Sequence, residues 1–378
     1  MTKKILFVTS KSFGGSGKYI ECLADGLKEK GFICELIYSR SDVSQDKLIE
    51  NAFDKVHFFQ SQMSMSPISI LKNIFKVRSL IKKGNFDWIH SHTSLGGLIG
   101  RLGGLFFYNK IKVAHTLHAF GADEFTPIPQ KWIYWIIERM LDFMTDIYFC
   151  PSNYMKQYGK SIKVLNPNKC RVVHNSLPLP SPPVDPSKVS KKWRSEMNIN
   201  ANDVVYLFCG RIEKQKGVDV LVNAFALVDK TLNFKLVICG QGDDEKEIRN
   251  LITKHDLWPN IIWAGWQSNL EPFYCSSDVY IMPSRWESFG LVFLEAMNHS
   301  LPIISTSVQA IPEVVTDGEV GILSRSEDEV ILAENIELMI KDSGLRLKLG
   351  IAGNKRVNSI FSYEQFVTGH SKVYESST

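Results

Sequence analysis

The 378-residue sequence lacks the features that mark a secreted or membrane-spanning chain. Its first apolar run, Ile5 to Val8, is too short for the core of a signal peptide. The longest apolar stretches, around 95–108 and 132–149, are interrupted by charged residues, so neither is expected to span a bilayer. These absences predict a cytoplasmic protein without a transmembrane helix.

Paired cysteines are also absent. The seven cysteines are an odd number, and none belongs to a Cys-x-x-Cys pair. We therefore expect buried, reduced thiols and neither a disulfide framework nor a zinc site. No Asp-x-Asp motif follows an expected strand, so no essential metal and no other cofactor are expected.

The composition is typical of a folded protein, with 44% hydrophobic and 22% charged residues in a chain long enough for two domains. The charge is unevenly distributed. Residues 1–178 contain 24 Lys and Arg against 14 Asp and Glu, a net charge of +10, whereas residues 179–378 contain 20 against 26, a net −6. A basic first half favours an anionic partner.

Apolar strand patterns alternate with helical patterns in both halves of the chain, which indicates βαβ units and parallel sheets. The strands expected in the first half lie at 3–10, 32–38, 86–91, 111–116 and 147–151, with a first helix at 17–30. The strands expected in the second half lie at 204–209, 235–239, 261–264, 279–283 and 302–305, with helices from Val218, Glu245, Phe289 and Glu327.

A proline-rich segment separates the two alternating patterns, and proline can neither continue a helix nor donate to a sheet. The sequence thus predicts a Rossmann-like domain at 1–177, a linker at 178–188 and a second doubly wound domain at 189–360. A final helical pattern lies in 361–378. Ligands of such sheets bind at the carboxyl ends of the strands.

A glycine-rich segment, Phe13 to Lys18, follows the first expected strand and opens the first helix. Backbone amides and the helix dipole favour a phosphate at such a position. The segment is not a Walker A loop, because Ser12 and Tyr19 stand where that motif needs Gly and Ser or Thr. Two interpretations stay open: a tight turn that packs helix on strand, or a loop that contacts a ligand.

Charged residues follow two strands of the second half. Arg211 and Lys216 lie where cations neutralise a leaving diphosphate, although exposed loop cations are often only solvated. Glu287 and Glu295 flank Gly290, where a helix with free N–H groups should begin. Carboxylates beside an anion site suit the hydroxyls of a sugar and a ribose. In the alternative interpretation, Glu287 is an acid at a helix N-terminus and Glu295 is a buried structural carboxylate.

Taken together, the motifs of the second half resemble those of glycosyltransferase family 4. The Glu-x7-Glu segment from Glu287 to Glu295 is similar to the family's signature, and other segments match it in order. These segments are Gly210-Arg211 with Lys216-Gly217, Val237 to Gly242, and Ala310 to Glu313. The resemblance runs nearly end to end and implies the GT-B fold: two Rossmann-like domains facing each other across a cleft, with a C-terminal helix that crosses back to the first domain.

The resemblance also implies roles for residues. Arg211 and Lys216 would bind the donor diphosphate, Glu295 the ribose hydroxyls and Glu287 the transferred sugar. Arg211, Lys216 and Glu287 are the expected catalytic residues together with His118, which matches a family histidine facing the reacting sugar but is equally interpretable as a hydrogen-bonded strand-end histidine. The remaining expected donor contacts are Gly15, Gly240, Phe289, Gly290 and Leu291.

The sequence departs from the family at two positions. Asn175 is followed by Ser176 where the family has Asn-Gly, which puts in doubt its expected contact with the acceptor. Ala119 follows His118 where Asp or Gly is usual. Neither departure removes a charged group of the expected site.

The family resemblance implies a retaining transferase that moves a hexose or N-acetylhexosamine from a nucleotide-diphosphate sugar, with UDP favoured. The basic first half suggests that the acceptor is a lipid-linked saccharide or glycolipid, as in bacterial surface polysaccharide synthesis (O-antigen, lipopolysaccharide or capsule). The alternatives are a GDP-mannose-dependent mannosyltransferase, a nucleotide-sugar epimerase, and a catalytically silent scaffold that binds nucleotide sugars.

The basic first half suggests an anionic membrane surface as a partner, at the inner face of the cytoplasmic membrane. Lys72 to Lys83 interleaves cations with apolar residues, and Trp132 to Trp135 adds amphipathic aromatics. Each segment is also interpretable as an ordinary amphipathic helix on a sheet. No nucleic-acid partner is expected, because the first half contains no recognised nucleic-acid-binding module.

Overall fold

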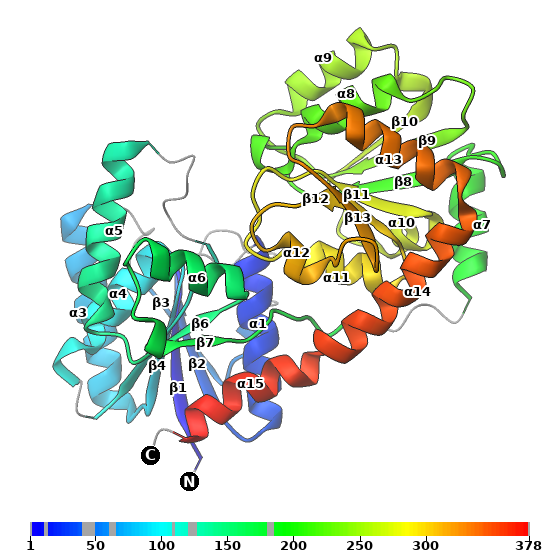
Figure 1. The fold of residues 1–378 in the computed structure, drawn as a ribbon. Helices are drawn as coiled ribbons and strands as arrows, with labels where there is room; N and C mark the ends of the chain where they lie inside the picture. Colours follow the sequence, from blue (N-terminus) through cyan, green and yellow to red (C-terminus); the bar gives the residue numbers. More distant parts are fainter. Residues whose placement is uncertain are drawn as a thin grey trace. The chain divides into compact units, whose positions relative to one another are not determined.

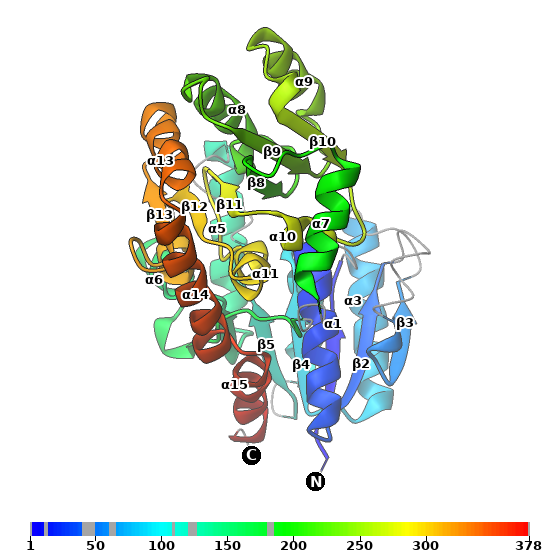
Figure 2. The same cartoon turned by 90° about the vertical axis from the view of Figure 1, so that its right-hand side faces the viewer.

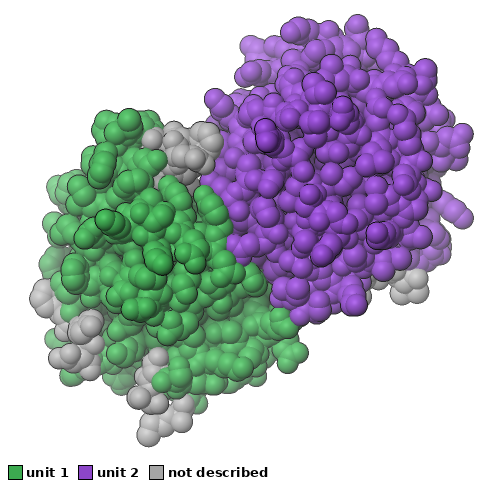
Figure 3. All heavy atoms as spheres, in the orientation of Figure 1, with its two compact units in different colours: residues 1–178, 362–378 green, residues 179–361 purple. Residues whose placement is uncertain are grey.

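A computed structural model describes residues 2–10, 14–39, 50–59, 66–107, 110–119, 127–179 and 185–376. The chain divides into two compact units: unit 1 comprises residues 1–178 and 362–378, and unit 2 comprises residues 179–361 (Figure 3). Both units contain a parallel sheet covered by helices. The predicted fold class of two Rossmann-like α/β domains is therefore confirmed.

Unit 1 is built on a seven-stranded parallel sheet in the order β3-β2-β1-β4-β5-β6-β7 (Figure 1). Its strands are β1 (Lys4–Val8), β2 (Ile33–Tyr38), β3 (Lys55–Phe58), β4 (Trp88–His92), β5 (Lys112–Thr116), β6 (Ile147–Cys150) and β7 (Cys170–Val172). Its helices are α1 (Gly14–Glu29), α3 (Pro67–Gly84), α4 (Ser94–Gly104), α5 (Ile128–Asp142), α6 (Asn153–Ser161) and α15 (Tyr363–Ser376). The order reverses between β1 and β4, so the switch point of this sheet lies there.

The C-terminal helix α15 belongs to unit 1 although it follows unit 2 in the sequence. It packs along α1, and both views show the two helices side by side (Figures 1 and 2). A Cβ on Gly26 of α1 would lie only 2.3 Å from Cγ2 of Val367, so glycine is what allows the close approach. The Tyr363 hydroxyl also donates to the main-chain oxygen of Cys22 at 2.6 Å.

Unit 2 has a six-stranded parallel sheet in the order β10-β9-β8-β11-β12-β13. Its strands are β8 (Val204–Cys209), β9 (Phe234–Cys239), β10 (Ile261–Gly265), β11 (Val279–Met282), β12 (Ile303–Thr306) and β13 (Gly321–Ser324). Its helices are α7 (Pro186–Glu196), α8 (Val218–Leu227), α9 (Glu245–Lys254), α10 (Glu271–Ser276), α11 (Leu291–Asn298), α12 (Ile311–Val314), α13 (Glu329–Lys341) and α14 (Ser343–Ile360). The switch point lies between β8 and β11.

Central strands of unit 2 such as β8 and β11 are continuous apolar runs because helices cover both faces of the sheet. All six residues of β8 are buried, as are all four of β11. All seven cysteines are free thiols, and six of them are buried. In the described part of the chain, no helix combines the length and apolarity needed to cross a bilayer.

The predicted linker at 178–188 is wrong at its end. Helix α7 begins at Pro186, because proline fits the first position of a helix and the Asp185 side chain caps it by accepting from the Lys188 amide at 3.0 Å. Residues 180–184 of the linker lie outside the described residues. The first helix begins at Gly14, three residues before the predicted start, and Phe13 of the glycine-rich segment is not described.

Candidate functional site

Two loops meet at the switch point of the unit 2 sheet. One follows β8 and carries Lys216, and the other follows β11 and carries Glu287. Lys216 Nζ donates to Glu287 Oε2, and the two side chains are only 12% and 9% exposed. Residues that are 71 positions apart in the sequence are thus held together by a largely buried ion pair at the carboxyl edge of the sheet.

Glycines allow the loops at this edge to approach closely. Gly217 has φ of +65°, and a Cβ there would lie 2.2 Å from the Pro283 main-chain oxygen in the loop after β11. A Cβ on Gly240 would lie 1.9 Å from the Gly210 main-chain oxygen. Gly240, predicted as a donor contact, therefore has a structural reason to be glycine: it packs the loop after β9 against the loop after β8.

Arg211 is held within its own loop. Its side chain is 62% exposed, and it contacts Glu213 Oε2 at 2.6 Å and Gln215 Oε1 at 2.8 Å. Gln215 in turn donates from Nε2 to the main-chain oxygen of Trp286 at 3.0 Å. The guanidinium is thus accessible from solvent, and Gln215 links its loop to the residue before Glu287.

Sequence reasoning missed Arg285, which fixes the second loop. Its guanidinium pairs with both oxygens of Asp219 at 2.8 and 2.7 Å and also contacts Glu327. Hydrogen bonds to Asp219 are the main reason why the pKa of Arg285 is raised. With its side chain only 8% exposed, Arg285 attaches the loop after β11 to the start of α8.

Helix α11 begins beside Glu287. Gly290 precedes it with φ of +84°, and Leu291 is its first residue. The first N–H groups of a helix have no intrahelical acceptor and carry partial positive charge, so this end suits an anion. Phe289 is 1% exposed and packs against Phe361, so only its main chain is available for the predicted donor contact.

Glu295 lies further along α11 and accepts a hydrogen bond from the Tyr274 hydroxyl at 2.7 Å. Tyr274 is buried on α10, and burial, followed by the negative charge of Glu295, raises its pKa well above the usual value. The tyrosine therefore stays protonated and orients the carboxylate. Tyr274 could not be selected from sequence alone, because α10 and α11 come together only in the fold.

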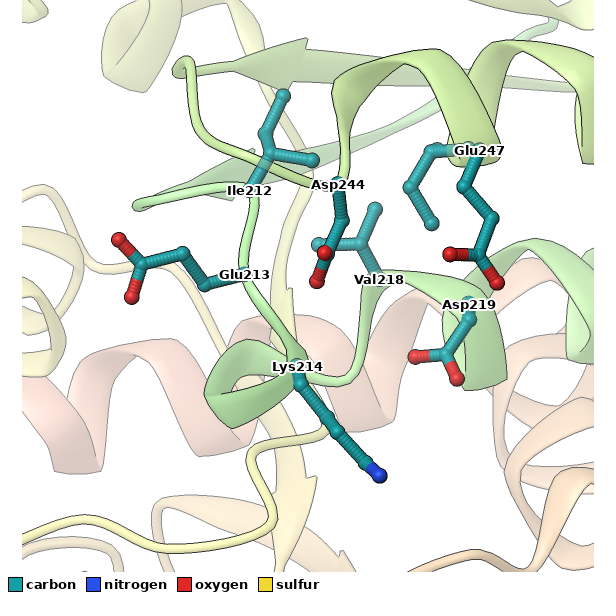
Figure 4. A pocket seen from close by; sticks show the side chains of 8 residues that line it. Ile212, Glu213, Lys214, Val218, Asp219, Asp244 and Glu247 are labelled. Carbon is teal, nitrogen blue, oxygen red and sulfur yellow. The ribbon is translucent and has the colours of Figure 1, made fainter.

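The pocket in Figure 4, about 250 Å³ in volume, is a different feature. It lies between the loop after β8 and the starts of α8 and α9, and four carboxylates line it. They belong to Glu213, Asp219, Asp244 and Glu247. None of Lys216, Glu287 and Glu295 lines this pocket, and its four carboxylates, against the one lysine Lys214, disfavour a diphosphate.

In unit 1, His118 follows β5 and pairs with His92 at the end of β4. His118 Nε2 and His92 Nδ1 are 3.2 Å apart, and the Tyr19 ring meets His118 edge-on with centroids 4.8 Å apart. Burial lowers the pKa of His118 to about 4, so the ring is neutral at neutral pH. Because Nε2 is engaged with His92, Nδ1 is the nitrogen available for another partner.

A buried polar network continues from this pair to the C-terminal helix. Tyr19 shares hydrogen bonds with Thr116 and with His370 of α15, at 3.3 and 2.7 Å. His90 bonds Thr116 and Tyr374 of α15, both at 2.7 Å. Sequence analysis did not predict this network, since the residues of α15 are far from β4 and β5 in the chain.

The two other predicted residues of unit 1 have contrasting surroundings. Gly15 lies exposed in the first turn of α1, next to residues that are not described. Asn175 follows β7 and is 8% exposed, and its Oδ1 has no hydrogen-bond partner among the described residues. An unsatisfied buried amide oxygen is costly, so Asn175 has unused capacity to accept a hydrogen bond.

Comparison with known proteins agrees with the class that the fold and the site define, a GT-B glycosyltransferase. The family model "Glycosyl transferases group 1" matches residues 189–356, and the model "Glycosyltransferase Family 4" matches residues 13–179. An uncharacterized glycosyltransferase of Methanocaldococcus jannaschii is 30% identical over 373 residues, which cover 96% of this chain and 94% of the relative. The chain belongs to glycosyltransferase family 4.

Other relatives and a solved structure are also similar. A capsular polysaccharide biosynthesis glycosyltransferase of Staphylococcus aureus is 26% identical, over 85% of this chain and 84% of the relative. An Escherichia coli UDP-Gal:alpha-D-GlcNAc-diphosphoundecaprenol alpha-1,3-galactosyltransferase is 24% identical, over 78% and 77%. The crystal structure of Anabaena HepE with UDP and glucose has a TM-score of 0.84 and 17% identity, covering 99% of this chain and 100% of that protein. This structural similarity concerns the fold.

Proposed function

We propose that this glycosyltransferase retains the anomeric configuration and moves a hexose or N-acetylhexosamine from a UDP-sugar to a lipid-linked saccharide in bacterial surface polysaccharide synthesis. The observation that carries the proposal is the Lys216–Glu287 ion pair at the switch point, beside the start of α11. The relatives named for capsular polysaccharide and for a diphosphoundecaprenol acceptor support the acceptor class.

In this mechanism, cleavage of the sugar–phosphate bond leaves negative charge on the nucleotide diphosphate. Lys216, Arg211 and the first amides of α11, at Gly290 and Leu291, neutralise that charge as it develops. The carboxylate of Glu287, already oriented by Lys216, accepts hydrogen bonds from the sugar hydroxyls. The acceptor hydroxyl attacks on the face that the diphosphate leaves, which retains the configuration, and its proton passes to the departing diphosphate oxygen.

Glu295 binds the ribose hydroxyls, as the family resemblance implies, and the 2.7 Å hydrogen bond from Tyr274 orients its carboxylate for them. His118 contacts the transferred sugar through Nδ1, and Gly15 and Asn175 contribute to substrate contacts in unit 1, as the family resemblance implies. The neutral state of His118 suits a hydrogen bond to a sugar hydroxyl better than a charge interaction.

We also propose that unit 1 binds an anionic membrane surface. Helix α5 presents exposed apolar side chains at 128, 132, 136 and 140, a stripe with one residue per turn. Lys131 and Arg139 flank the stripe. Helix α3 similarly exposes Ile68, Leu71 and Phe75 among its lysines. Unit 1, with its C-terminal helix included, has a net charge of +9 against −5 for unit 2.

A thermal-shift panel of UDP, GDP, ADP and their common sugar conjugates tests the donor, because selective binding to the folded state raises the melting temperature. We expect a shift with uridine nucleotides that Lys216→Ala abolishes. A shift with guanosine nucleotides alone would favour the GDP-mannose alternative. Binding without release of nucleotide in the presence of lipid-linked acceptors would favour the scaffold alternative.

A further inference from the structure

Glu271, Cys275 and His299 bring three metal-binding atoms together in unit 2. Glu271 and Cys275 lie one turn apart on α10, and His299 follows the last residue of α11. The carboxylate oxygen, the sulfur and the ring nitrogen all lie within 4.8 Å of one another. None of these residues belongs to the proposed donor site, so the inference stands apart from the proposed function.

The surroundings of His299 orient its ring. Nδ1 lies 2.9 Å from the main-chain oxygen of Glu295, which can only accept, so Nδ1 donates this hydrogen bond. Nε2 lies 3.1 Å from Glu271 Oε1 but makes no hydrogen bond with any described residue. The side chain is only 6% exposed. A buried ring nitrogen without a hydrogen bond therefore lies beside a carboxylate oxygen, and a cation held by both atoms would give Nε2 a partner.

The third group indicates which cation fits. Cys275 Sγ lies 3.6 Å from the same oxygen of Glu271. A nitrogen, a sulfur and a carboxylate oxygen suit Zn²⁺, whereas Mg²⁺ and Ca²⁺ prefer oxygen ligands alone. A backbone carbonyl on Nδ1 is also the usual outer partner of a metal-bound histidine, because it orients the ring.

We propose that Glu271, Cys275 and His299 form a zinc-binding site with a fourth position open to water. On binding, Zn²⁺ takes the lone pair of His299 Nε2 and an oxygen of Glu271. The Zn–S bond forms as the thiol of Cys275 releases its proton to solvent, and nothing is oxidised or reduced. The ion then bridges α10 to the end of α11 and gives the buried Nε2 a partner.

Spacing rules could not predict this site. They search for pairs such as Cys-x-x-Cys, and here one cysteine and one glutamate share a helix face while the histidine comes from another helix. The sequence-based expectation that zinc is absent rested on that missing pair.

The test uses the full-length, untagged protein, freed of metal by a chelator and titrated with Zn²⁺ and with Co²⁺. We expect one equivalent of Zn²⁺ to bind and to raise the melting temperature. We expect bound Co²⁺ to show a thiolate charge-transfer absorption band. Cys275→Ser should abolish that band, and His299→Gln should weaken Zn²⁺ binding at least about 10-fold. His255→Gln, a half-buried histidine elsewhere in unit 2, is the matched control and should bind as the wild type does.

X-ray absorption at the zinc edge of the wild-type complex gives a result that does not depend on a variant folding correctly. A first shell with one sulfur and with nitrogen and oxygen ligands is expected. Absence of stoichiometric binding, a shell without sulfur, or equal loss of binding in His255→Gln would overturn the proposal.

Discussion

At the scale of single residues, the Lys216–Glu287 ion pair has two proposed roles, one in binding the diphosphate and one in stabilising the fold, and substitutions can separate them. Lys216→Met removes a cation from the proposed diphosphate site and leaves the Glu287 carboxylate largely buried without its partner. We expect the rate of nucleotide release from the donor to fall by about 100-fold or more. We also expect the free energy of unfolding to fall by about 3 kcal/mol, as for other broken buried pairs.

The double variant Lys216→Met with Glu287→Gln tells the two roles apart. Neutralising the carboxylate should restore most of the stability, measured by urea unfolding, but none of the activity. Lys214→Met, which changes an exposed lysine of the same loop, should leave both quantities near wild type. Full activity in the Lys216 variant would exclude its role at the diphosphate.

Tyr274 offers a milder test of the nucleoside site. Tyr274→Phe removes the 2.7 Å hydrogen bond that orients Glu295 and keeps the aromatic packing. If Glu295 binds the ribose, the KM for the donor should rise by about 10-fold, the equivalent of one lost hydrogen bond to a charged group, with little change in kcat. Steady-state kinetics at saturating acceptor measure this split. A fall in kcat with an unchanged KM would instead place Glu295 near the reacting atoms.

At the scale of secondary-structure elements, the contact between α1 and α15 depends on Gly26. An alanine in a helix normally stabilises it relative to glycine, by about 1 kcal/mol. Here the added Cβ would meet Val367 Cγ2 at 2.3 Å, so we expect Gly26→Ala to destabilise unit 1 by about 1–3 kcal/mol. Calorimetry of the double variant Gly26→Ala with Val367→Ala should show recovery of part of that loss, because the second substitution removes both γ-methyl groups of Val367 that meet the new Cβ.

The buried histidines that join β4, β5 and α15 make unit 1 sensitive to acid. Burial lowers the pKa of His370 to about 4, whereas an unfolded histidine titrates near about 6.5. Between these values the unfolded chain binds a proton that the folded unit does not. Stability is therefore full above about pH 6.5 and falls as the pH decreases toward 4, by up to about 3 kcal/mol for this residue.

Urea unfolding at several pH values between 4 and 7 measures how the stability of unit 1 depends on pH. Hydrogen exchange of the unit 1 strands monitors the unfolding of this unit. His370→Gln should reduce the slope by about 1.4 kcal/mol per pH unit, which corresponds to one proton. His255→Gln changes a histidine of unit 2 and should leave the slope of unit 1 unchanged. An unaltered slope in the His370 variant would mean that this ring titrates normally.

The elements themselves show what a sequence can predict. Strands with long apolar runs, such as β8, were predicted to the residue, since burial on both faces leaves a continuous pattern. Three strands were missed: β3, β7 and β13. All three are sheet edges of only three or four residues, and two of them, β3 and β7, have lysine, histidine or arginine among their residues. Short edge strands carry little periodic signal.

The candidate site likewise contains residues that the sequence predicts and residues that it does not. Lys216, Glu287 and Glu295 stand in spaced motifs beside expected strand ends, so sequence reasoning could select them. Arg285 and Tyr274, which hold the loop and the carboxylate in place, were not predicted, because their partners come from other elements and depend on side-chain directions. Contacts within a local motif are thus readable from sequence, and contacts that support the motif from outside are not.

At the scale of the whole molecule, the uneven charge and the exposed helices of unit 1 lead to a last prediction about membranes. Trp132 on α5 is 58% exposed, and Trp266 in unit 2 is 57% exposed. If α5 lies at a bilayer interface, removal of Trp132 should cost the burial of one large apolar side chain, about 1.5 kcal/mol or more, and Trp266 should not matter. Trp132→Ser should then weaken binding to vesicles at least about 10-fold, with wild-type binding in Trp266→Ser.

Co-sedimentation with vesicles of phosphatidylglycerol and of phosphatidylcholine separates the two contributions. The net charge of +9 on unit 1 predicts stronger binding to the anionic vesicles and a decrease with added salt, because exposed charges are screened beyond about 10 Å at 0.1 M. The apolar contribution of Trp132 should persist at high salt. Equal losses in the two tryptophan variants, or no preference for anionic lipid, would show that α5 does not face the membrane and that the basic surface serves the acceptor alone.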